Sequence, residues 1–385
     1  MSTATQADTA AACIDLTVGY LPLTDCAALI VAAELGFDRR YGIRIRLSRE
    51  ASWAAIRDKL LTGALDAAHA LYGLIYGVHL GLGGVQRDMA VLMTLNQNGQ
   101  GITLAAQLAA EGVHSGEDLA RRVRHDVRPF TFAQTFPTGT HAMWLYYWLA
   151  THGIHPLRDV KSIVVPPPLM VAALRAGQMD GYCAGEPWHS LGAAEGVGFT
   201  IASSGDIWPD HPEKVLGCTA DWAAANPDAA RALIAALLDA SRFVDDVRNR
   251  AQVAQLLAER AGLPLPAGVL NAGLSGTCVA GGLKCFDDGR VNYPYLSDGM
   301  WFLTQYRRWG LLREEPDYLG IARRINQQAL YQQGAELAGV ALPASSMRSS
   351  RLIDGVVWDG RDPAGYAAAF AVQGGMAAGN VALTR

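Results

Sequence analysis

The first hundred residues alternate between short runs of β-type residues and longer runs in which apolar residues recur at helical spacing. Strands are expected at 14–22, 43–48 and 89–95, and helices at 25–37 and 52–63. Asp25 and Ser52 stand where N-caps belong, and Gly36 stands where the first of these helices should end. The repeated strand–helix order predicts a mainly parallel sheet covered by helices on both faces.

The same α/β pattern begins again after residue 104 and predicts a second lobe. Strands are expected at 130–134 and 179–185, with helices and a further strand between them. A proline-rich and acidic stretch at 205–214 precedes an apolar run that predicts a return to the first lobe. The prediction is an α/β protein with a cleft between two lobes. The expected division is 14–103 and 215–312 for lobe 1, 104–214 for lobe 2, and 313–385 for a C-terminal segment packed on the lobes.

Composition and charge narrow the function classes. The 385 residues are 50% hydrophobic and 18% charged, and the net charge of −4 leaves no basic surface for direct DNA or RNA binding. No apolar stretch reaches the length of a membrane span. The N-terminal residues show no cationic and apolar leader pattern, so a cytoplasmic protein is expected. The six cysteines show no CxxC or metal-site spacing, so free thiols are expected and no metal or cofactor is implied.

Polar and mostly uncharged side chains gather where the strands are expected to end. In open α/β sheets, ligands bind at the carboxyl ends of strands, facing helix N-termini. These positions hold amides and a hydroxyl in LNQNGQG and AQTFP, and glycine amides at 99, 139 and 185. Lys214, in WPDHPEKVLG, adds the one full cation. Neutral donors with helix N-termini and one cation suit a small monovalent anion, whereas the P-loop and dinucleotide patterns for phosphates are absent.

Several of these residues also fit purely structural roles. Trp53, at the start of a helix, either closes the anion pocket or packs in the core, and core packing is slightly favoured. The aromatic residues within 144–148 have the helical spacing of core residues. His141 and His211 have no paired carboxylate in the sequence, and Glu186 is expected to cap the helix that follows it. Because no nucleophile–base signature occurs, binding is favoured over catalysis.

Seven stretches between about residues 15 and 312 resemble the NrtA/CmpA-like family of nitrate- and bicarbonate-binding receptors of ABC transporters. They include VGYLPLTDCAALIVAAELGF, ASWAAIRD, LNQNGQGI, FTFAQTFPTGTHAMWLYYWLA, GYCAGEPW and HPEKVLGCTADW. The resemblance implies a type II periplasmic-binding-protein fold, in which two hinged α/β lobes clamp the anion between them. In the C-terminal segment, DGVVWDGRDPAGY resembles the closing segment of the family.

In the family, five segments each supply one anion-binding residue, and the resemblance carries these roles to Trp53, Asn98, Gln134, Gly185 and Lys214. Asn98 stands where the family has glutamine, and Gln134 stands where it has histidine. Both substitutions keep a neutral donor, so a planar monoanion still fits, and the preference between nitrate and nitrite stays open. The accessory candidates beside them are Gln97, Gln100, Thr135 and Glu186.

The expected absence of an export leader makes the chain similar to the leaderless NasS-like nitrate/nitrite sensors. Such a protein would hold a NasT-type ANTAR antiterminator, an RNA-binding regulator of nitrate assimilation genes, inactive until the anion favours the closed state. The alternative is the substrate-binding component of an ABC nitrate or bicarbonate transporter. Bicarbonate is less favoured because Glu186 is the one nearby acid, and a thiamine-pyrimidine synthase is less favoured because the cysteines are scattered. Lys214→Ala is expected to abolish the anion response and to leave the fold intact.

Overall fold

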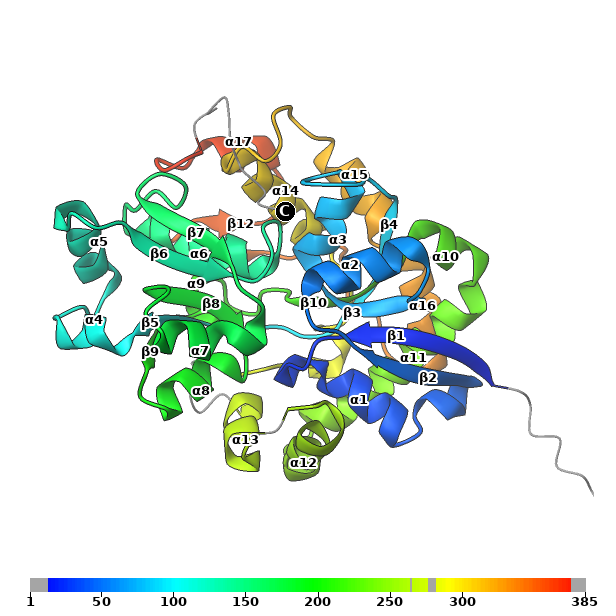
Figure 1. The fold of residues 1–385 in the computed structure, drawn as a ribbon. Helices are drawn as coiled ribbons and strands as arrows, with labels where there is room; N and C mark the ends of the chain where they lie inside the picture. Colours follow the sequence, from blue (N-terminus) through cyan, green and yellow to red (C-terminus); the bar gives the residue numbers. More distant parts are fainter. Residues whose placement is uncertain (1–12, 264, 276–281, 375–385) are drawn as a thin grey trace, which may run out of the picture.

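The computed structural model describes residues 13–263, 265–275 and 282–374. Its helices and strands form two α/β lobes, one on each side of Figure 1. Each lobe is built on a five-stranded sheet. The expected two-lobed α/β architecture is confirmed. None of the helices in the described part of the chain is long and apolar enough to cross a membrane.

The first sheet has the strand order β2-β1-β3-β10-β4. Its strands are β1 (Ile14–Tyr20), β2 (Ile43–Arg49), β3 (Ala67–Leu71), β4 (Met89–Thr94) and β10 (Lys214–Thr219). β1 runs parallel to β2 and β3, whereas β10 runs antiparallel to both β3 and β4. The prediction of a mainly parallel sheet is wrong at β10, because this strand returns from the second lobe and enters the sheet from the opposite end.

The second sheet has the order β7-β6-β8-β5-β9. Its strands are β5 (Gln100–Ala105), β6 (Phe130–Gln134), β7 (Val160–Val164), β8 (Gly181–Gly185) and β9 (Gly198–Ser203). β6 runs parallel to β7 and β8, and β5 runs antiparallel to β8 and β9. The expected lobe boundary at residue 104 lies within β5, so the second sheet begins earlier in the chain than expected. The chain therefore crosses between the sheets twice, at 95–99 and at 204–213.

Helices pack against both sheets. Those of the first lobe are α1 (Ala27–Glu34), α2 (Trp53–Thr62), α3 (Tyr72–His79), α10 (Ala220–Ala225), α11 (Pro227–Asp245) and α12 (Arg250–Arg260). Those of the second lobe are α4 (Ala106–Ala110), α5 (Gly116–His125), α6 (Thr140–Thr151), α7 (Met170–Arg175), α8 (Trp188–Ala194) and α9 (Ser204–Ile207). Later in the chain come α13 (Ala267–Ser275), α14 (Leu296–Arg308), α15 (Tyr318–Ile325), α16 (Gln328–Leu337), β11 (Ser350–Arg351), β12 (Val357–Trp358) and α17 (Pro363–Ala368).

α6 is apolar around nearly its whole circumference, as a helix buried on all sides must be. Its residues 140–150 are all buried, which confirms that the aromatic residues of this run belong to the core. The ring of Trp144 packs against Trp301 of α14 with 4.9 Å between ring centroids. α6 also contacts α3 of the first lobe, so it forms part of the junction between the lobes.

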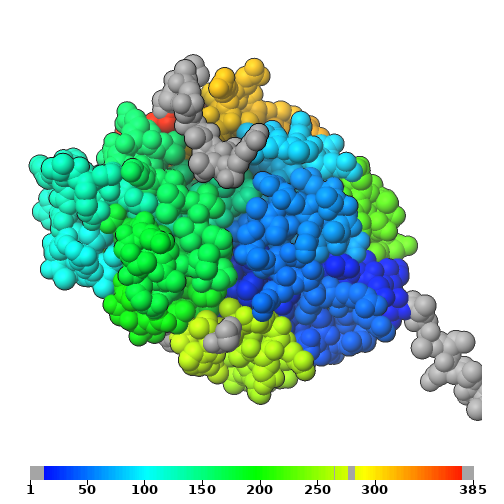
Figure 2. Space-filling view, viewed as in Figure 1, coloured from blue at the N-terminus to red at the C-terminus, as the bar shows by residue number. Residues whose placement is uncertain are grey.

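The segment after α14 contacts elements of both lobes. α16 packs on α11 of the first lobe, and the hydroxyl of Tyr147 in α6 donates a 2.8 Å hydrogen bond to Asp354. α17 packs on α14 at the top of the junction in Figure 1. On the face shown in Figure 2 the two lobes touch along their junction, and the α12–α13 region spans its lower end. The described cysteines are free thiols, as expected, and Cys278 lies outside the described residues.

Candidate functional site

Lys214 is the first residue of β10 and lies at the junction of the two lobes. Its ammonium nitrogen is fully buried and lies 2.7 Å from Oδ2 of Asp25 and 2.9 Å from Oε1 of Glu213. Burial lowers the pKa of Lys214, but the two carboxylates outweigh this effect and raise the pKa above its usual value. The cation predicted from the sequence lies between the lobes, and it is already paired with two acids.

Asp25 lies in a short 3-10 helix, η1 (Thr24–Cys26), which follows β1. The prediction that it caps α1 is wrong, because the residue before α1 is Cys26 and it makes no side-chain cap. The Asp25 carboxylate instead contacts Lys214 and, through Oδ1, Nε2 of His69 at 2.9 Å. Burial raises the pKa of Asp25, but Lys214 and His69 outweigh this effect. The pKa of Asp25 is therefore well below its usual range.

Glu213 is the second acid beside Lys214, and it binds donors from the second lobe. Its carboxylate accepts hydrogen bonds from the hydroxyl of Thr140 and from Nε1 of Trp144, the latter at 2.9 Å. Burial raises its pKa, but Lys214 and the nearby histidines outweigh burial and lower it. The expectation that Glu186 is the one acid near the anion site is therefore wrong.

Gln100, His141 and Thr135 form a hydrogen-bonded chain on the second-lobe side. The side-chain Nε2 of Gln100 donates a hydrogen bond to Asp25 at 3.4 Å. The side-chain carbonyl of Gln100 lies 2.7 Å from Nε2 of His141, and the other ring nitrogen of His141, Nδ1, lies 2.8 Å from the hydroxyl of Thr135. His141 Nε2 also lies 3.7 Å from Glu213. The view of His141 as a histidine without a paired carboxylate is therefore wrong. Of the accessory candidates, Gln100 and Thr135 belong to this cluster.

Trp53 is the first residue of α2 and is buried, and its ring faces the charged cluster. Lys214 Nζ lies 5.6 Å from the ring centroid, within cation–π range, and the His69 ring centroid lies 5.8 Å away. Nε1 of Trp53 is buried and makes no hydrogen bond. Ser52 caps α2 as predicted, accepting from the backbone N–H of Ala55 at 3.1 Å. Trp53 is thus both a core residue and a wall of the cluster.

Gln134 and Gly185 lie at the ends of β6 and β8, as expected. Gln134 is buried, and its side-chain Oε1 has no hydrogen-bond partner. A Cβ at position 185 would lie 2.7 Å from Oε1 of Gln100 and 3.6 Å from Oδ2 of Asp25. A larger residue at position 185 would therefore displace the Gln100 amide from its place in the cluster.

The remaining predicted residues make contacts within the chain segments around the cluster. Asn98 has a left-handed φ of 59°, and its side chain exchanges hydrogen bonds of 3.1 and 3.0 Å with Asp210 across the two crossovers. Gln97 pairs through its backbone with Pro212 and Lys284. The prediction that Glu186 caps α8 is wrong, because its carboxylate accepts a 2.6 Å hydrogen bond from Ser190 and α8 has no side-chain cap.

Sequence reasoning missed five members of the cluster. They are Asp25, His69, Thr140, His141 and Glu213. Two signals were available. Glu213 directly precedes the predicted cation, and His69 is the one strongly polar side chain in the buried strand AAHAL. A polar side chain inside a strand buried on both faces needs a partner, and here the partner is Asp25.

With its histidines neutral, the cluster carries one positive and two negative charges in a fully buried setting. Burial lowers the pKa of His141 and of His211 to about 4, and it also lowers that of His69, so the three rings are neutral near pH 7. Within the described residues, no group of three or more His, Cys, Asp or Glu side chains could hold a metal ion. The unpaired indole N–H of Trp53 beside an ammonium group suits a small acceptor ligand.

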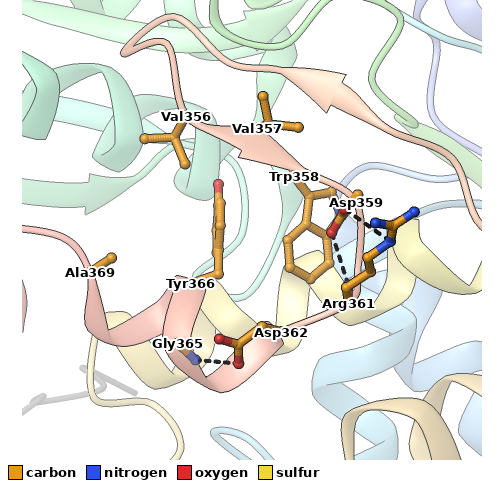
Figure 3. Close-up of a pocket in the computed structure, with 9 residues that line it drawn as sticks. All are labelled: Val356, Val357, Trp358, Asp359, Arg361, Asp362, Gly365, Tyr366 and Ala369. Carbon is orange, nitrogen blue, oxygen red and sulfur yellow. Dashed lines mark hydrogen bonds and ion pairs between the residues drawn. The ribbon is translucent and has the colours of Figure 1, made fainter.

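A separate cavity of about 410 Å³ lies between β12 and α17. Figure 3 shows that Val356, Val357 and Trp358 line it from β12 and the residue before it, and that Tyr366 lines it from α17. None of the predicted anion-binding residues lines it. The charged cluster and this cavity are therefore distinct places in the molecule.

Comparison with known proteins agrees with the two-lobed fold. Residues 10–258 match the NMT1-like family. The chain belongs to this family. It is 34% identical over 377 residues to the nitrate/nitrite binding protein NrtA of Synechocystis. The alignment covers 91% of this chain and 83% of that protein. It is also 34% identical to the nitrate import ATP-binding protein NrtC of the same organism, but spans 55% of that protein's length.

Among solved structures, the periplasmic nitrate-binding protein NrtA from Synechocystis superposes with a TM-score of 0.86 at 33% identity, over 93% of this chain and 98% of that one. A ligand-binding component of an ABC-type import system from Staphylococcus aureus, at 20% identity and a TM-score of 0.68, shares the fold. This member of the NMT1-like family therefore has the two-lobed periplasmic-binding-protein fold, and it is homologous to nitrate-binding proteins.

Proposed function

We propose that this chain binds a small monovalent anion, nitrate or nitrite, between its lobes beside Lys214. The observation that carries the proposal is the fully buried ammonium group of Lys214 next to the unpaired indole N–H of Trp53. Its homology to proteins named as nitrate/nitrite binding supports this ligand class.

The charges favour a monovalent ligand over a multivalent one. Asp25 and Glu213 already offset the charge of Lys214, so each further negative charge in the buried cluster carries a large desolvation cost. A planar monoanion needs few donors, and the amide of Gln100 adds a group that adapts to either nitrate or nitrite. Phosphate and sulfate are expected to be rejected for the same reason.

We further propose that the protein is a cytoplasmic sensor that holds a NasT-type ANTAR antiterminator and releases it when the anion binds. Supporting this mechanism, the two lobes meet at the cluster and the segment after α14 contacts both of them. An anion that favours the closed state would shift the population away from the form that holds the regulator, and couplings of about 1–3 kcal/mol are typical. The similarity to NrtA supports the alternative, a substrate-binding component of an ABC transporter.

Titration of the purified chain with nitrate, nitrite, bicarbonate and chloride, alone and in complex with the candidate antiterminator, tests these proposals. Saturable nitrate or nitrite binding that dissociates the complex is the expected result. Anion binding without any association with the antiterminator would contradict the sensor role and leave the transport role. Failure of nitrate and nitrite to bind would overturn the proposed function as a whole.

A further inference from the structure

His69 differs from the other histidines of the cluster in having a free ring nitrogen. His141 contacts Gln100 and Thr135 through its two nitrogens, at 2.7 and 2.8 Å. His211 contacts Ser204 and the carbonyl of Pro212, at 2.7 and 3.0 Å. His69 contacts Asp25 through Nε2, whereas its Nδ1 is buried and has no partner.

The contact with Asp25 fixes where the proton of a neutral His69 ring lies. A carboxylate accepts hydrogen bonds, so Nε2 must carry the hydrogen that points to Oδ1 of Asp25 at 2.9 Å. Nδ1 of the neutral ring is then an unprotonated acceptor. An anion cannot donate to it, and the lone pair of Nδ1 would repel an anion placed nearby.

The arrangement around the ring places His69 beside the groups that would contact the anion. The ring centroid of Trp53 lies 5.8 Å from that of His69, and Lys214 Nζ lies 5.6 Å from the centroid of the same indole. Trp53 Nε1 and His69 Nδ1 are both buried without partners. Both atoms are therefore available to hydrogen-bond a small ligand.

We propose that anion binding draws one proton from the solvent onto His69, so that its Nδ1–H becomes a donor to the anion beside Trp53 and Lys214. This inference rests on the proposed anion binding. Without the proton, a bound monoanion would make the net charge of the buried cluster more negative, from −1 to −2, counting Lys214 against Asp25 and Glu213. With the proton, the net charge stays at −1, and Asp25 stabilises the imidazolium through the hydrogen bond already present.

The groups that face His69 favour a neutral ring before the anion binds and a protonated ring afterwards. Burial lowers the pKa of His69 in the free protein, and Lys214 of β10 lowers it further. Asp25 of η1 and Glu213 raise it, but by less than burial and Lys214 together lower it. From α2 the neighbour is Trp53, which does not titrate. The ring is therefore neutral at neutral pH, and an added anion supplies the negative charge that favours its protonated form.

Calorimetric titration of the full chain with sodium nitrate, in HEPES and in Tris at matched ionic strength, measures the protons taken up on binding. At neutral and mildly alkaline pH we expect uptake approaching one proton per nitrate. The affinity should then weaken about tenfold for each unit of rising pH where a full proton is taken up. Nitrate binding with equal heats in both buffers and with an affinity independent of pH would overturn the inference and leave the proposed function standing. No nitrate binding at any pH would overturn both.

The His69→Gln variant tests whether His69 is the group that takes up the proton. The variant keeps an amide donor for Asp25 but cannot titrate, so we expect nitrate binding that is weaker, independent of pH and without proton uptake. His79→Gln is the matched control, because His79 of α3 is also a buried histidine of the first lobe with a pKa lowered by burial. It should keep the uptake. Uptake that persists in folded His69→Gln protein would overturn the assignment, and if this variant does not fold, the two-buffer titration of the unaltered chain still decides.

Discussion

Two trios of charged side chains with matching composition lie in opposite surroundings. The surface trio consists of Arg122, Glu111 and Asp126. The buried trio consists of Lys214, Asp25 and Glu213. In each, one cation lies between two carboxylates, with N–O distances of 2.7 and 2.8 Å at the surface and 2.7 and 2.9 Å in the cleft. The side chains are 23–32% exposed in the surface trio and 0–3% exposed in the buried trio.

The comparison shows that environment, rather than geometry, sets what such a trio does. At the surface, water screens the pairs, and they contribute little to folding. In the cleft, all three charges have been removed from water, and each depends on the others to offset that cost. A buried trio is a poor way to stabilise a fold, which fits our proposal that it serves to hold a cation for a small anion. Loss of Lys214 should therefore destabilise the fold, in contrast to the expectation from the sequence.

The largest effect is expected from Lys214→Met. Removing the cation leaves two buried carboxylates without a partner, and breaking a buried pair in this way costs about 3–5 kcal/mol. We expect the free energy of unfolding in urea to fall by that amount and nitrate binding to be lost.

Arg122→Met is the matched control, because it removes the cation of the surface trio and leaves its two carboxylates exposed. Its free energy of unfolding should change by less than about 1 kcal/mol. Equal losses in the two variants would contradict the distinction between the trios.

Acid should destabilise the folded protein through the histidines that surround the buried trio. The folded pKa of His141 and of His211 is about 4, below the usual value of 6.5, so the unfolded chain binds more protons between these values. The free energy of unfolding should therefore fall as the pH drops from 6.5 to 4, by at most about 1.4 kcal/mol per pH unit for each histidine. Denaturation across this range checks the slope, and His141→Gln should reduce it. A free energy that stays constant or rises on acidification would contradict the burial of neutral histidines.

Asp25→Asn should separate anion binding from proton uptake. Asparagine can accept from Lys214 through its carbonyl and donate through its amide to Nε2 of His69, which moves the hydrogen of the neutral ring to Nδ1. The ring could then donate to the anion without gaining a proton. We expect nitrate binding to persist with proton uptake near zero in the two-buffer titration. Undiminished uptake in this variant would contradict the role assigned to the Asp25–His69 hydrogen bond.

The smallest expected effect is the change of the ion-pair coupling energies with salt concentration. The coupling between Arg122 and Glu111, measured by a double-mutant cycle with Arg122→Met and Glu111→Gln, should be about 0.2–1 kcal/mol and should decrease at high ionic strength. A cycle on the buried trio should be insensitive to salt, because mobile ions do not reach it. Equal salt dependence of the two cycles would show that water enters the cleft.

Much of the fold follows from the hydrophobic pattern, because apolar periodicity and caps such as Ser52 act locally. β2, β4 and β6 lie within a residue of their expected bounds. The directions of β5 and β10 were not predictable in the same way. Both strands have the composition of buried strands, and the pattern of apolar residues is the same whether such a strand runs parallel or antiparallel to its neighbours.

The candidate site was predictable only in part. Position along the chain nominates the segments that hold Lys214 and Trp53, and the family resemblance supplies the roles expected of these two residues. Their partners are distant in the chain, with 189 residues between Asp25 and Lys214 and 41 between Gln100 and His141. Asp25 also stands at a position where an N-cap is common, so the local reading was physically sound and was overridden by a tertiary ion pair.

A crystal structure of the protein with nitrate tests the central claim most directly, because it shows where the anion lies. We predict an anion in the cleft with oxygen atoms about 3 Å from Lys214 Nζ and Trp53 Nε1, and with His69 Nδ1 within hydrogen-bonding distance. An anion bound elsewhere, for example in the cavity between β12 and α17, with the buried trio unchanged, would contradict the account.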